Sequence, residues 1–181
     1  MGEYTRFDFP LVFFPDKNEV DTALLEPFFV DYSPDKWVEE PEEAYIEYVE
    51  DDVSFGCRIG HCVGLGFSIL FWQSDLSSRS GEAWWTVNDK SKEYYFVDIE
   101  SDSMRSVATF VSPLDAWSYL KHFLSNPTEM PPSLDLESNL VFRDQIPVHP
   151  LYGGPPLPEG IANCYRIDSV NQSLIPMVLQ E

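Results

Sequence analysis

Short runs of β-branched and aromatic residues follow one another between residues 44 and 111, and this succession constrains the fold more than any other feature. Such composition is typical of β-strands. The run 63–72 is almost entirely apolar, which indicates a strand covered on both faces. We expect strands over 44–49, 54–59, 63–72, 83–87, 93–99 and 108–111, with the polar residues 88–92 turning 83–87 back onto 93–99 as a hairpin. These runs predict a mainly antiparallel sheet.

The clearest helix signal comes directly after these runs, at 113–124. Ser112 can cap the first turn, Pro113 suits its first position, and Asp115 favours a helix N-terminus. One apolar stripe then recurs at helical spacing, made by Leu114, Trp117, Leu120 and Leu124. A shorter helix is expected over 18–29, from the spacing of Val20, Leu24, Leu25 and Phe28. The predicted fold class is α+β, a mainly antiparallel sheet with one or two helices packed on one face.

Prolines crowd the chain after residue 125. Eight of the 15 prolines lie between 126 and 160, and proline interrupts both helices and ladders. Apolar residues are nevertheless too frequent there for a free linker. We therefore expect an α+β core over 1–125 and a Pro-rich C-terminal arm over 126–181, packed on the core within a single domain, with one docking strand in 161–181.

Acidic residues dominate the charge of the chain. The 181 residues include 31 acids and 11 Lys or Arg, a net charge of −20, and the segment 31–52 holds ten acids against Lys36 alone. Direct binding of nucleic acid or of an anionic membrane is disfavoured, because phosphate binding needs a cationic surface. With 44% hydrophobic residues, the chain can bury a core and is not an acidic disordered tail. The charge favours a basic protein partner.

The lack of a recognisable targeting signal and the odd number of cysteines predict a protein of the cytoplasm. The N-terminus carries no basic segment before an apolar run, and the longest apolar stretch, 62–72, is too short to span a bilayer. Three cysteines cannot pair completely, which favours a reducing compartment. A secreted chain whose leader has been removed is the alternative.

Catalytic and metal motifs are weak in this sequence. Cys57, His61 and Cys62 have C-x3-H-C spacing, which lacks the paired halves of a structural zinc site, so buried small side chains are the preferred interpretation. We expect no enzyme activity and no cofactor. One alternative is a divalent-metal-dependent enzyme, because Asp98, Glu100 and Asp102 alternate along a predicted strand and would share a face.

The acidic segment is the candidate binding site. Its carboxylates are interleaved with aromatic residues, and protein interfaces combine aromatic anchors with charges that steer association. The predicted partner-binding residues are Trp37 and Tyr45 as anchors, with the carboxylates of Glu39, Glu40, Glu42, Glu43, Glu47, Asp51 and Asp52. The alternative for the same segment is a solvated face that only keeps the protein in solution.

The order of elements carries a family resemblance. Residues 83–87 (AWWTV), 94–99 (YYFVDI) and 110–117 (FVSPLDAW) describe a predicted hairpin, a strand and a Ser-Pro-capped helix. Over residues 63–125 this order and the acidic charge resemble the small acidic immunity proteins of bacterial polymorphic and type VI toxin systems. The resemblance implies a cytoplasmic antitoxin that binds and blocks a cognate toxin domain, with no catalytic residues. The Pro-rich arm departs from the smaller members. An acidic nucleic-acid mimic that inhibits a DNA-binding host protein is the alternative.

Overall fold

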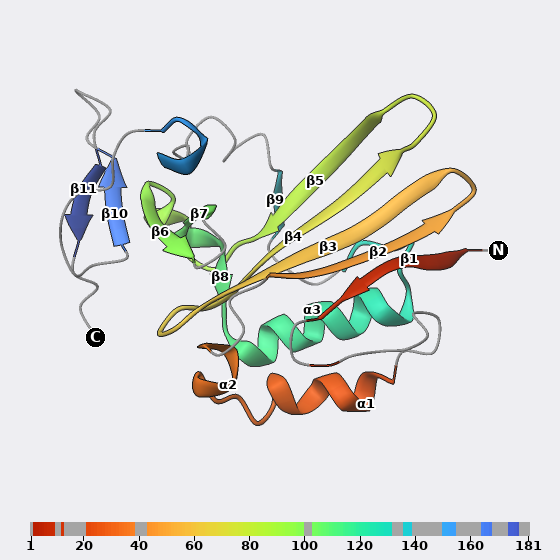
Figure 1. The fold of residues 1–181 in the computed structure, drawn as a ribbon, viewed down its shortest axis with the longest axis horizontal. Coiled ribbons are helices and arrows are strands. Elements are labelled where there is room, and N and C mark those ends of the chain that lie inside the picture. The colour runs from red at the N-terminus through yellow and green to blue at the C-terminus, as the bar shows by residue number, and fades with distance from the viewer. Residues whose placement is uncertain are drawn as a thin grey trace.

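The protein has the α+β fold that the sequence predicts, but its strands form two antiparallel sheets rather than one, with a helical layer beside them (Figure 1). The computed structural model describes residues 2–9, 12, 21–38, 43–99, 103–131, 136–138, 150–154, 164–167 and 174–177. Within these ranges, no helix is both long enough and apolar enough to cross a membrane.

The larger sheet has the order β1-β2-β3-β4-β5-β9, with β8 also paired to β4. Its strands are β1 Glu3–Asp8, β2 Ala44–Glu50, β3 Val53–Cys62, β4 Gly66–Asp75, β5 Ser80–Thr86, β8 Phe110–Val111 and β9 Leu136–Ser138. Strands β2 to β5 form an antiparallel meander. Asp51 and Asp52 alone connect β2 to β3, both with positive φ (50° and 63°). Asp tolerates this left-handed conformation better than most residues, so a two-residue hairpin turn forms here without glycine.

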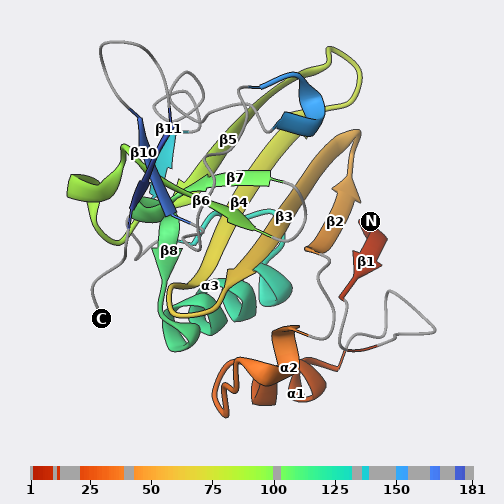
Figure 2. The same cartoon turned by 60° about the vertical axis from the view of Figure 1, so that its left-hand side comes forward.

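A helical layer covers one face of this sheet (Figures 1 and 2). Helix α3, Pro113–Ser125, begins as predicted, because the Ser112 hydroxyl accepts a hydrogen bond from the Asp115 amide at 3.2 Å. Helix α1 (Thr22–Leu25), the 3-10 turn η1 (Glu26–Phe28) and helix α2 (Asp35–Val38) complete the layer. The shared core is aromatic and includes Phe29, Phe67, Phe71, Trp117 and Phe123.

The smaller sheet packs on the opposite face and has the order β11-β10-β6-β7. Its strands are β6 Tyr95–Ile99, β7 Ser103–Ser106, β10 Cys164–Ile167 and β11 Leu174–Met177. A Cβ on Gly60 would lie 2.8 Å from the Ile99 side chain, so glycine at this position of β3 leaves room for the smaller sheet. Cys62 of β3 and Leu65 of the turn after it pack against the cluster that contains Val97 and Cys164 of the smaller sheet.

The predicted hairpin of 83–87 with 93–99 is wrong, because β5 pairs with β4 and β9 while β6 pairs with β7 and β10. Between β5 and β6 the chain forms the 3-10 turn η2 (Lys90–Lys92), whose Ser91 amide donates to the Asp89 carboxylate at 3.1 Å. The Asn88 amide donates instead to the Ala108 carbonyl at 2.9 Å, which directs the chain away from β5. A polar loop alone therefore did not identify the partner of either strand.

The C-terminal arm contributes strands to both sheets. Strand β9 extends the larger sheet beside β5, and β10 pairs with β6 and β11. One strand was expected over 161–181, and the structure has two there. The 3-10 turn η4 (Pro150–Tyr152) lies between β9 and β10 in sequence.

Candidate partner-binding surface

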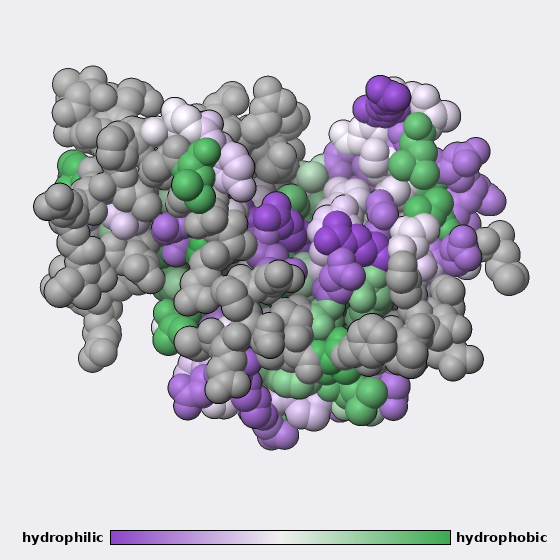
Figure 3. All heavy atoms as spheres, viewed as in Figure 1, coloured by the Kyte–Doolittle hydropathy of each residue, from purple (hydrophilic) through white to green (hydrophobic). Residues whose placement is uncertain are grey.

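One row of residues crosses four strands of the larger sheet on the face away from α3. The register pairs Arg6 of β1 with Glu47 of β2, Glu47 with Gly56 of β3, and Gly56 with Trp72 of β4. The neighbouring row pairs Asp8 with Tyr45 and Tyr45 with Arg58. We call the side chains of Arg6, Asp8, Tyr45, Glu47, Arg58 and Trp72 the open face. All six remain at least partly exposed, and hydrophilic residues gather over β2 and β3 in this view (Figure 3).

Aromatic rings line the open face. The Tyr45 and Trp72 ring centroids are 5.0 Å apart, and the Arg6 guanidinium lies 4.0 Å from the Tyr45 centroid. Gly56 makes this possible, because a Cβ at that position would lie 2.0 Å from the Trp72 ring. The indole therefore lies directly against the backbone of β3. Arg6 forms an ion pair with Asp8, which balances its charge on this face.

Glu47 is held beside these rings by hydroxyl groups. Thr5 Oγ1 donates to Glu47 Oε2 at 2.9 Å, and Ser54 Oγ donates to Glu47 Oε1 at 2.7 Å. Trp72 Nε1 donates in turn to Ser54 Oγ at 3.4 Å, which links the indole edge to the carboxylate. Among the described residues, no cation forms an ion pair with Glu47. Its carboxylate is therefore oriented but keeps its charge available.

Carboxylates gather where the hairpin turns and the start of β1 meet. The Leu76 amide donates to the Asp52 carbonyl at 2.9 Å, joining the two turns, and the Gly2 amide donates to Glu50 Oε1 at 3.0 Å. Hydrogen bonds from Ser77 and Ser78 lower the pKa of Asp75 to about 2, so this group stays ionised at neutral pH. We call this group the acidic end, made by Glu3, Glu50, Asp51, Asp52, Asp75 and Glu82.

The structure brings together four of the predicted site residues. Tyr45 and Glu47 lie on the open face, and Asp51 and Asp52 form the adjacent turn of the acidic end. Glu39, Glu40 and Glu42 lie outside the described residues. Trp72 and Arg6 were missed, because nothing local in the sequence shows that β1 and β4 meet β2 in one row. The signal that could have pointed to Trp72 is the glycine opposite it, Gly56, but this pairing is known only from the strand register.

Trp37 is not an exposed anchor, which corrects one sequence prediction. Its side chain is 4% exposed and packs against Phe9, Phe29 and Phe67. The indole Nε1 donates to the Phe28 carbonyl at 3.2 Å. Helix α2 turns this ring toward the sheet, because an amphipathic helix buries its largest apolar side chain.

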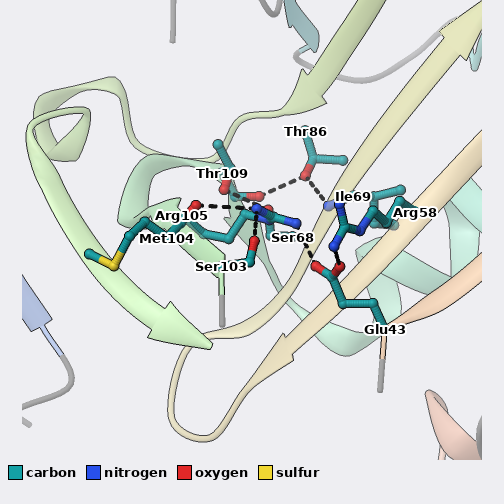
Figure 4. Close-up of polar contacts among 9 residues, drawn as sticks. All are labelled: Glu43, Arg58, Ser68, Ile69, Thr86, Ser103, Met104, Arg105 and Thr109. Atoms are coloured by element: carbon teal, nitrogen blue, oxygen red, sulfur yellow. Dashed lines mark hydrogen bonds and ion pairs between the residues drawn. The ribbon is translucent and has the colours of Figure 1, made fainter. Parts of the chain in front are cut away.

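Glu43 is also buried, so its predicted role in steering a partner is wrong. Its carboxylate, 7% exposed, forms ion pairs with Arg58 of β3 and with Arg105 of β7 (Figure 4). The Arg105 side chain is 8% exposed and lies against the Trp85 ring, 4.9 Å from its centroid. Burial lowers the pKa of Arg105, and Glu43 opposes that change. Glu43 therefore joins the two sheets electrostatically.

The alternative metal site gains no support from the described residues. Asp98 lies on β6 opposite Met104, while Glu100 and Asp102 lie outside the described part of the chain. Within that part, no group of three His, Cys, Asp or Glu side chains is arranged to hold a metal. Cys57 and Cys164 are buried, and burial raises the pKa of both thiols, which makes them poor nucleophiles.

His61 is half-buried against the aromatic core. Its Nε2 lies 2.8 Å from the Tyr32 hydroxyl, and its ring contacts Trp37 and Phe67. Burial lowers its pKa from 6.5 to about 4, so the folded chain keeps the neutral ring, whose Nε2 can accept a hydrogen bond from the Tyr32 hydroxyl. This environment explains the histidine without metal binding.

We expect His61 to make the protein less stable in acid. The unfolded chain binds a proton at this group near pH 6.5, and the folded chain only near pH 4, so the free energy of unfolding falls as the pH drops through that window. His61→Gln removes this contribution. Urea unfolding between pH 7 and pH 4 should show the wild type losing stability faster than the variant, and parallel curves would contradict the assignment.

The open face and the acidic end are identified from the residues of this chain alone. A scan against protein-family models found no match to the sequence, and searches of curated proteins and of solved structures found none either.

Proposed function

We propose that the protein is a binding protein that inhibits a basic protein partner, and that it acts as an immunity protein against a bacterial toxin domain in the cytoplasm. The observation that carries the proposal is the placement of Tyr45, Glu47, Asp51 and Asp52 on one continuous surface beside Trp72. The resemblance of residues 63–125 to immunity proteins and the net charge of −20 support the same conclusion.

The physical basis of inhibition is charge complementarity. A toxin that acts on nucleic acid presents a basic cleft to its substrate. An acidic end next to partly exposed rings can enter such a cleft, because the carboxylates accelerate encounter and the rings provide contact area. Occupying the cleft excludes the substrate, so no catalytic group is required.

The turn of the acidic end offers a test that preserves the fold. Asp51→Asn with Asp52→Gly removes two charges and installs the dipeptide that two-residue turns prefer. We expect the association rate with a basic toxin domain that the wild-type chain binds to fall about threefold to tenfold at low salt, since steering depends on local charge. Stopped-flow measurement at increasing salt should show the association rates of the turn variant and the wild type converging.

A matched control removes the same charge elsewhere. Asp31→Asn with Asp35→Asn changes two exposed carboxylates in the helical layer, away from the acidic end. This variant should associate nearly as fast as the wild type. Equal slowing by both double variants would mean that only net charge matters, and no slowing by the turn variant would remove the acidic end from the interface.

A further inference from the structure

Trp72 and Glu47 combine an aromatic surface with a carboxylate that has no cationic partner among the described residues. The indole lies on Gly56, so that one ring face is against the backbone of β3 while the side chain as a whole stays half-buried. Its Nε1 is connected to Glu47 Oε1 through the Ser54 hydroxyl. The ring and the carboxylate are therefore held in a fixed relation.

The same face already binds one guanidinium within the chain. Arg6 stacks on Tyr45 at 4.0 Å and forms an ion pair with Asp8, so that a ring and a carboxylate together hold one arginine. Trp72 of β4 and Glu47 of β2 repeat this combination on the same face. Tryptophan attracts a stacked cation more strongly than tyrosine does.

The other cations of the open face do not occupy this position. Arg6 is held by Tyr45 and Asp8, and Arg58 is held by Glu43. Both are neutralised by their own carboxylates, so the charge of Glu47 is left for a group from outside. The nearby acidic end adds further negative potential, which favours a cation over a nucleobase or a phosphate.

We propose that Trp72 and Glu47 form a recognition site for an arginine side chain of the basic partner. This inference rests on the proposed function and deepens it, because it names the chemical group that the surface selects. A guanidinium is planar and stacks on the indole while its N–H groups donate to the Glu47 carboxylate. A lysine ammonium matches the charge but neither the stacking nor the paired hydrogen bonds.

The experiment compares oligo-arginine and oligo-lysine peptides of equal length as probes, by calorimetry with the full chain. The wild type should bind oligo-arginine about 3-fold to 30-fold more tightly than oligo-lysine, the range expected for one cation–π contact. Trp72→Leu should abolish this preference, and Trp72→Phe should retain part of it. Glu47→Gln should weaken the binding of oligo-arginine more than that of oligo-lysine.

A measurement on the unaltered protein guards against misfolded variants. Oligo-arginine should shift the indole N–H resonance of Trp72 more than those of the other four tryptophans, assigned from the Trp72→Phe spectrum. Oligo-lysine should shift it less at equal saturation. Equal affinity for the two peptides, or an unmoved Trp72 resonance, would overturn the arginine site.

The two proposals fail in different ways. The turn variant Asp51→Asn with Asp52→Gly should weaken both peptides to a similar degree and leave the arginine preference intact. If the preference is absent but the turn variant still slows association with the toxin domain, the arginine site is wrong and the binding function stands. If single-stranded DNA of similar length binds through Trp72, both proposals are wrong.

Discussion

Glu43→Gln is expected to lower the free energy of unfolding by about 3–5 kcal/mol, because it leaves a buried arginine without its counter-charge. Glu43 is 7% exposed and forms ion pairs with both Arg58 and Arg105. Arg105 is buried between the sheets and cannot recover hydration without separating them. Urea unfolding followed by tryptophan fluorescence measures the loss as a lower midpoint at constant slope.

Two matched variants show whether the buried arginine is responsible. Arg58→Gln removes the more exposed partner, whose side chain is 40% exposed, and should cost about 1 kcal/mol or less. Adding Arg105→Met to Glu43→Gln should restore much of the lost stability, since an apolar chain of similar length can fill the site. A loss below about 1 kcal/mol for Glu43→Gln would show that water reaches the pair.

Phe29→Ala is expected to cost about 3–5 kcal/mol, the typical loss for removing a buried ring. Phe29 is fully buried after η1 and joins the helical layer to the sheet. Its ring centroid lies 4.9 Å from that of Phe67 on β4 and 5.6 Å from that of Trp117 on α3. The neighbouring helices α1 and α2 are each only four residues long and depend on such contacts.

The adjacent Phe28 provides the control for this prediction. Its ring is only half-buried, against Phe9 and Trp37, so Phe28→Ala should cost clearly less than Phe29→Ala. Relative to the wild type, Phe29→Ala should accelerate hydrogen exchange more in α1 and α2 than in β3 and β4. Equal losses for the two variants would mean that the layer is not anchored through Phe29.

Local signals explain which elements could be predicted. The cap at Ser112, the proline at the first position and the apolar stripe lie within one helix, so α3 was found at Pro113–Ser125, within one residue of the prediction. The strands β2, β3 and β4 were found because their composition is also local, although β4 runs over Gly66–Asp75 rather than the predicted 63–72, since residues 63–65 form the turn after β3. The hairpin of β5 with β6 failed because strand pairing is a long-range choice.

The candidate site divides in the same way. Tyr45, Glu47, Asp51 and Asp52 follow one another along β2 and its turn, and a single segment was enough to select them. Trp37 and Glu43 come from the same acidic segment but turn inward, one toward Phe67 and the other toward Arg105. Composition cannot separate these two groups, because burial depends on what packs against each residue.

The amino-acid sequence by itself determined the α+β class, the long helix, most of the strands of the larger sheet and the excess of negative charge, because each of these follows from composition or short-range spacing. Tertiary structure alone decided that Trp72 lies on Gly56 beside Glu47, and that Arg6 completes their row. Sheet register brings these residues together across separations of up to 66 positions, and register is set by the packing of the whole core rather than by any one strand.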